Sequence, residues 1–211
     1  MTDDNPYRPP SSDLANWSEG LPESPPPFRA RWLRTAAWYT LLMLALSIPS
    51  TADSFSPGLL APALSKFLLV AVTVLAIYVL YVMVGYLEYR YAARNLRTVF
   101  YTLAALNLVL GTASLFELGG DPENLSAFDF AALGLYVFFG GVIAVFGYRI
   151  RKIQTTNRYV TSLGWLAMLQ GICAASIVLI ILAIPLGMFF DVLLVMYFFS
   201  AARELVEAGH P

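Results

Sequence analysis

Long apolar runs alternate with short polar segments along most of the chain, after a polar stretch at the N-terminus. An α-helix needs about 20 mostly apolar residues to cross the hydrocarbon core of a bilayer. Four of the runs have about this length, so each predicts one membrane-spanning helix. These four runs cover residues 32–50, 67–87, 98–116 and 130–148.

The last apolar run, residues 162–202, is too long for one span. A helix of roughly 40 residues would be about 60 Å long, twice the thickness of the hydrocarbon core. The sequence Ile184-Pro185-Leu186-Gly187 supplies a break, because proline removes a backbone hydrogen bond and clashes with the preceding turn. We therefore expect a fifth helix over 162–183 and a sixth over 186–202. The pattern predicts an all-α fold, a polytopic transmembrane bundle of six spans within residues 29–203.

The polar stretch, residues 1–28, holds seven of the thirteen prolines and few aliphatic residues. Such a segment buries too little apolar surface to offset the entropy of ordering, so we expect a disordered tail. Residues 204–211 form a short segment after the last span.

Basic residues give the bundle an orientation. If the tail is cytoplasmic, twelve of the thirteen Lys and Arg residues lie on the cytoplasmic side and only Lys66 lies outside. Cytoplasmic loops of membrane proteins carry an excess of Lys and Arg, so both termini are predicted to be cytoplasmic. Trp38, Tyr86, Tyr148 and further aromatic residues near the inner helix ends predict an interfacial belt. The twelve basic residues are Arg8, Arg29, Arg31, Arg34, Arg90, Arg94, Arg97, Arg149, Arg151, Lys152, Arg158 and Arg203.

The amino-acid composition agrees with a membrane protein and argues against several kinds of binding site. The 211 residues are 58% hydrophobic and 13% charged, and thirteen basic residues nearly balance fourteen acidic ones. The bilayer is therefore the expected partner, and nucleic acid is not. Cys173 is the only cysteine and His210 the only histidine, which argues against disulfides and against Cys or His metal sites. We predict no cofactor and no metal; enzymatic activity stays open but is disfavoured.

Short similarities suggest three tandem two-helix hairpins. Leu33-Arg34-Thr35 reappears as Leu96-Arg97-Thr98, and residues 103–107 (LAALN) resemble residues 166–170 (LAMLQ). Three hairpins in the same orientation would be related by an axis along the membrane normal. Membrane segments share few residue types, so chance similarity is the alternative.

Polar residues within the spans form a candidate intramembrane site. Asp191 stands about six residues into the expected sixth helix, and an ionisable residue there suggests a functional site or a buried partner. The repeat alignment pairs Asp191 with Asp129 and Lys66 at equal depth, where Lys66 could neutralise Asp191. The alternative is that the acids favour helix N-termini and that Lys66 extends toward water. Asn107 and Gln170 occupy corresponding places and are candidates for the same site or for interhelical hydrogen bonds.

Small residues predict close helix packing. Gly140, Gly141, Ala144 and Gly147 lie in the fourth helix, and Gly164, Gly171 and Ala175 lie in the fifth. Such faces allow helices to approach closely, within one protomer or in a homo-oligomer.

The tail contains Asn5-Pro6-Tyr7-Arg8-Pro9-Pro10. This motif resembles the Asn-Pro-Tyr-x-x-Pro opening of many bacterial multi-pass membrane proteins, and the resemblance implies the bacterial inner (plasma) membrane. Asn5, Pro6, Tyr7, Pro9 and Pro10 form a candidate docking motif for a cytoplasmic partner; a solvated tail is the alternative.

Two functional hypotheses follow. The first is a non-enzymatic scaffold, accessory or regulatory subunit that acts through helix contacts with itself or another membrane protein. The second is a small transporter or channel that uses the intramembrane polar residues. The sequence assigns no substrate to either.

Overall fold

The computed structural model describes residues 29–56, 58–93, 96–115, 127–153, 155, 157–176 and 178–207. These residues form six α-helices and no strand, so the predicted all-α fold is confirmed for them. The helices are α1 (Ala30–Phe55), α2 (Pro62–Tyr91), α3 (Leu96–Leu115), α4 (Ala127–Arg151), α5 (Arg158–Ala175) and α6 (Ile180–Glu207).

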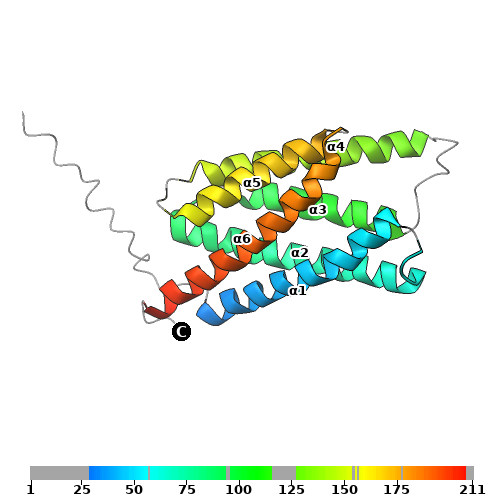
Figure 1. Cartoon of the computed structure of the whole chain (residues 1–211). Coiled ribbons are helices and arrows are strands. Elements are labelled where there is room, and N and C mark those ends of the chain that lie inside the picture. Colours follow the sequence, from blue (N-terminus) through cyan, green and yellow to red (C-terminus); the bar gives the residue numbers. More distant parts are fainter. Residues whose placement is uncertain are drawn as a thin grey trace, which may run out of the picture.

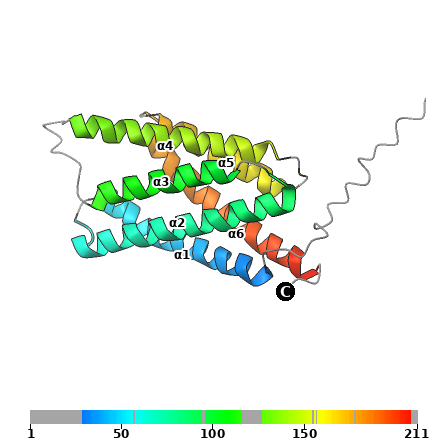
Figure 2. The same cartoon turned by 180° about the vertical axis from the view of Figure 1, so that it is seen from behind.

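The six helices form a closed ring. Consecutive helices run in opposite directions, so the start of α1 and the end of α6 lie at the same end of the bundle (Figures 1 and 2). Each helix packs against the next one in the chain, and α6 packs against α1. We call the end that holds the start of α1 the basic end, because Arg29, Arg31 and Arg34 lie there. The other is the distal end.

Among the described residues, four helices are long and apolar enough to cross a membrane: α2, α3, the Phe130–Arg151 part of α4, and α6. Their outer faces expose large apolar side chains such as Phe67, Phe138 and Phe189. Lipid tails are as apolar as these side chains, so the exposed apolar faces would be stable in a bilayer. The helices are therefore those of an integral membrane protein. The more polar α1 lies between α6 and α2, and the more polar α5 lies between α4 and α6.

The predicted break at Pro185 is wrong. Helix α5 ends at Ala175, where Ser176 takes an extended conformation and its N–H bonds to the carbonyls of Ile172 and Cys173. Helix α6 then begins at Ile180 and contains Pro185. One lost backbone hydrogen bond near the start of a long apolar helix is tolerated, because neighbouring helices hold the segment in place. The earlier start moves Asp191 from the first turns of α6 to its twelfth residue.

Packing is uneven along the bundle. The fully buried side chains gather toward the basic end, for example Leu33 of α1, Met83 of α2, Leu163 of α5 and Phe198 of α6. Burying a side chain of this size contributes about 1.5–3 kcal/mol, so this half supplies most of the packing energy among the described residues. The distal half leaves space between the helices.

The small residues of α4 and α5 face one another within the protomer. A Cβ atom at Gly171 would lie 2.6 Å from the carbonyl oxygen of Gly140 and would collide with the backbone of Ala144. A Cβ atom at Gly147 would lie 2.7 Å from the carbonyl oxygen of Gly164. The two backbones therefore touch over several turns. Gly141 takes no part in this contact, because a Cβ atom there would meet nothing within 4 Å.

Candidate functional site

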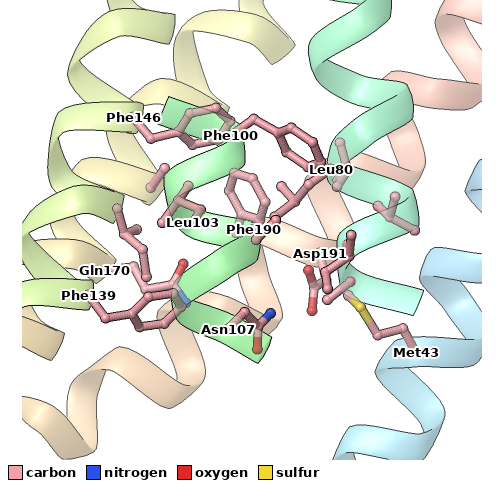
Figure 3. Close-up of a pocket in the computed structure, with 17 residues that line it drawn as sticks. Met43, Leu80, Phe100, Leu103, Asn107, Phe139, Phe146, Gln170, Phe190 and Asp191 are labelled. Carbon is pink, nitrogen blue, oxygen red and sulfur yellow. The ribbon is translucent and has the colours of Figure 1, made fainter. Parts of the chain in front are cut away.

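A cavity of about 180 Å³ lies inside the ring. Figure 3 shows its lining side chains, which come from every helix of the bundle. A cavity that all six helices share lies within the ring that they form, rather than between one pair of them. We call it the central cavity. Its lining includes Met43 of α1, Leu80 of α2, Asn107 of α3, Phe139 of α4, Gln170 of α5 and Asp191 of α6.

Three polar side chains that the sequence singles out converge on this cavity. Asn107, Gln170 and Asp191 point toward the same space from three different helices (Figure 3). Gln170 also packs tightly on α6, because its Nε2 atom would lie 2.8 Å from a Cβ atom at Gly187. Gly187 and Asp191 are one helical turn apart and share a face of α6. The missing side chain at Gly187 thus lets the Gln170 amide approach the Asp191 face.

The rest of the central cavity is largely apolar and aromatic. Phe100, Phe139, Phe146 and Phe190 line it together with aliphatic residues. Within the described part of the chain, no hydrogen bond or ion pair engages the side chains of Asp191, Asn107 or Gln170. A carboxylate held against apolar walls is costly unless a cation, a proton or hydrogen-bond donors compensate it. The arrangement is therefore suited to taking up a small polar or charged species.

Lys66 does not line the central cavity, and the side chain of Asp129 lies outside the described residues. Lys66 is the fifth residue of α2 and Asp129 is the third residue of α4, with a side chain outside the described part of the structure. At about 1.5 Å per residue, Asp191 lies about 16 Å into its helix, against about 6 Å for Lys66 and about 3 Å for Asp129. These distances from the helix starts differ because α6 starts earlier than Pro185 suggested. Equal depth in the membrane stays a prediction. Lys66 is not among the residues lining the central cavity.

A second cavity, of about 540 Å³, lies toward the distal end. Its lining includes the hydroxyl-bearing residues Ser47 and Thr51 of α1 and Tyr136 of α4. It shares Phe139, Ile143, Gln170 and Asp191 with the central cavity. Asp191 and Gln170 thus lie where the two cavities meet. We call the second cavity the vestibule.

Aromatic side chains fill the bundle between the central cavity and the basic end. The rings of Tyr86 and Tyr197 meet edge to face with centroids 6.1 Å apart, and each residue is only 1% exposed. The assignment of Tyr86 to an interfacial belt is therefore wrong, whereas Trp38 and Tyr148 are exposed as a belt requires. Sequence reasoning missed Tyr197. Its spacing from Phe190 and Leu194 puts it on the buried face of α6, and this signal could have identified it.

The candidate docking motif in the N-terminal tail, Asn5 to Pro10, lies outside the described residues. No family model, no curated protein and no solved structure matches the chain.

Proposed function

We propose that the protein is a multi-pass membrane protein that binds a small solute in the central cavity and moves it across the membrane. The observation that carries the proposal is one cavity that all six helices line, with Asn107, Gln170 and Asp191 converging on it. Ionisable residues inside membrane bundles commonly mark solute or ion pathways. Of the two sequence hypotheses, the transporter or channel is the one this geometry supports.

We further propose that all six helices span the bilayer. With 26 residues, α1 is about 39 Å long, and with 18 residues α5 is about 27 Å long, close to the thickness of the hydrocarbon core. Both are integral parts of the ring, and each packs against an apolar helix on either side. Their greater polarity fits helices that face neighbours and the cavities more than lipid.

The proposed orientation places the basic end in the cytoplasm of a bacterium and the vestibule on the outer side of its inner membrane. Ten of the eleven described Lys and Arg residues belong to the basic end, and Lys66 belongs to the distal end. The positive-inside tendency supports cytoplasmic termini. Reporter fusions test this: a fusion after Glu123 should report outside and one after Glu207 inside, and either result reversed would overturn the orientation.

The scaffold hypothesis loses one of its supports. Its sequence argument used the small-residue faces of α4 and α5, and these faces are occupied by each other within the protomer. A homo-oligomer would need another surface.

Flux measurements test the proposal. The purified full chain would be reconstituted in liposomes, and uptake of small cations, anions and neutral solutes would be followed at two pH values. We expect flux of at least one class, reduced about tenfold or more in Asp191→Asn. Glu207→Gln is the matched control, because Glu207 lies on the same helix but is exposed and pairs with Arg203. Flux that is absent for every class, or equal in wild type and Asp191→Asn, would refute the proposal.

A further inference from the structure

We infer that the solute is a small organic cation, an amine or a quaternary ammonium ion, held by Asp191 in the central cavity. This inference rests on the proposed function and names its substrate class. It follows from the charge, the size and the wall chemistry of the cavity.

Charge favours a cation. Among the described residues, neither the central cavity nor the vestibule is lined by a Lys or an Arg. Asp191 therefore lacks a basic counterpart in the lining of either cavity, and in a medium of low dielectric constant an uncompensated carboxylate is expensive. A cation that enters the cavity removes this cost, whereas an anion would increase it. The amide oxygens of Asn107 and Gln170 add acceptors for ammonium N–H groups.

Size favours a small organic molecule. A volume of about 180 Å³ is far larger than a bare metal ion and slightly larger than a cavity of about 150 Å³ that holds benzene in another protein. A cation of about five to eight non-hydrogen atoms fits such a space. A bare metal ion would leave most of it empty and would find few oxygen ligands there.

Wall chemistry favours an organic cation over an inorganic one. Phe100, Phe139, Phe146 and Phe190 present aromatic surface to the cavity. Aromatic faces attract organic cations, and groups of them recognise quaternary ammonium ions in other proteins. Hard inorganic cations such as Ca²⁺ and Mg²⁺ prefer about six or more oxygen ligands. The described lining offers one carboxylate, from Asp191, and the amide oxygens of Asn107 and Gln170. The vestibule, with the hydroxyls of Ser47, Thr51 and Tyr136 among apolar side chains, offers an amphiphilic path to the central cavity.

Binding to the purified full chain in detergent tests the inference. The probes are tetramethylammonium, its similarly sized neutral counterpart tert-butanol, and sodium, each measured by calorimetry and by the shift in unfolding temperature. Tetramethylammonium should bind the wild type and Glu207→Gln equally, and at least tenfold more weakly to Asp191→Asn. Tert-butanol and sodium should give no comparable effect.

A second measurement uses the wild type alone, in case Asp191→Asn does not fold. A hydrophobic carbodiimide labels carboxyl groups in apolar surroundings, and peptide mass spectrometry follows labelling at Asp191. Tetramethylammonium should slow this labelling, while tert-butanol should not. Equal protection by tert-butanol, or protection by sodium alone, would overturn the organic-cation class but leave solute binding in the cavity intact. No binding of any probe together with no flux would refute the proposed function itself.

Discussion

The hydroxyl group of Tyr197 lies in the tightly packed half of the bundle without a hydrogen-bond partner among the described residues. A buried polar group left unsatisfied costs about 1–3 kcal/mol. Replacing Tyr197 with Phe removes that group and keeps the ring against Tyr86, so we expect the unfolding free energy to rise by about 1 kcal/mol. Thermal unfolding in detergent would show a higher midpoint. Tyr136→Phe, at a 42% exposed position, should leave the midpoint unchanged. A lower midpoint for Tyr197→Phe would mean that the hydroxyl is bonded after all.

Asp53, near the end of α1 and beyond the apolar run of residues 32–50, provides a pH-dependent contribution to stability. Its carboxylate accepts a hydrogen bond of 3.0 Å from the backbone N–H of Leu60, and this bond holds the pKa of Asp53 below its usual value of 3.8. Because the folded-state pKa is depressed, the stabilisation is present above the unfolded-state pKa and is lost as the pH falls through the folded-state pKa.

We therefore expect wild type to unfold at a higher temperature than Asp53→Asn near neutral pH. This difference should disappear as the pH falls through the folded-state pKa of Asp53, which lies below 3.8. The measurement is the unfolding midpoint of both proteins across this pH range. A gap that is the same at every pH would show that the charge of Asp53 contributes nothing.

The sequence alone singles out Asn107, Gln170 and Asp191 as candidate site residues, because these polar residues stand out within apolar runs. It does not predict that they meet, since this depends on the order of helices around the ring. The position of Tyr86 could not be predicted either. A tyrosine near a helix end suits both an interfacial belt and a buried position, and the neighbouring helices determine which of the two it takes.

At the scale of elements, the close contact between α4 and α5 depends on glycines where the two backbones touch, such as Gly140 and Gly171. Gly171→Ala would place a methyl group against the backbones of Gly140 and Ala144, which cannot move without separating the helices. We expect a loss of about 1–3 kcal/mol, the usual cost of overpacking. Gly141→Ala is the matched control, and it should be neutral or stabilise by up to about 1 kcal/mol, because its surroundings are open. Chemical or thermal unfolding of both variants measures the difference, and equal midpoints would contradict the close α4–α5 contact.

Helix number follows from the apolar runs, but one boundary does not. Pro185 is the strongest breaking signal in the last run, yet the chain breaks between α5 and α6 around Ser176, where no proline or glycine stands. The packing of α5 on α4 and of α6 on α1 decides where the chain must turn. Those contacts join different helices, so no local pattern could reveal them. The misplaced boundary also explains why Asp191 lies further into its helix than the sequence predicts.

At the scale of the whole molecule, the ring itself could not be predicted. These helices carry apolar residues on their lipid-facing side as well as on their buried side. The hydrophobic periodicity that marks the buried face of a soluble helix is therefore weak in this sequence. The observed ring brings consecutive hairpins side by side, an arrangement that three tandem repeats about one axis would also give. The repeat remains a prediction.

The uneven packing of the bundle predicts unequal access to its two halves. A single cysteine at Ser47, which lines the vestibule, should react with a small cationic thiol reagent much faster than one at Ala201, which is 2% exposed near the basic end. Both variants would be made in a Cys173→Ala background, because Cys173 is the only native thiol. Rates measured in detergent by mass spectrometry report access to each half of the bundle.

Tetramethylammonium provides the control for this measurement. It should not protect Ala201→Cys, since the pair of Tyr86 and Tyr197 lies between that position and the central cavity. Comparable rates at Ser47→Cys and Ala201→Cys would mean that the basic end opens as readily as the distal end. The protein would then behave as a channel rather than as a transporter that exposes its site to one side at a time.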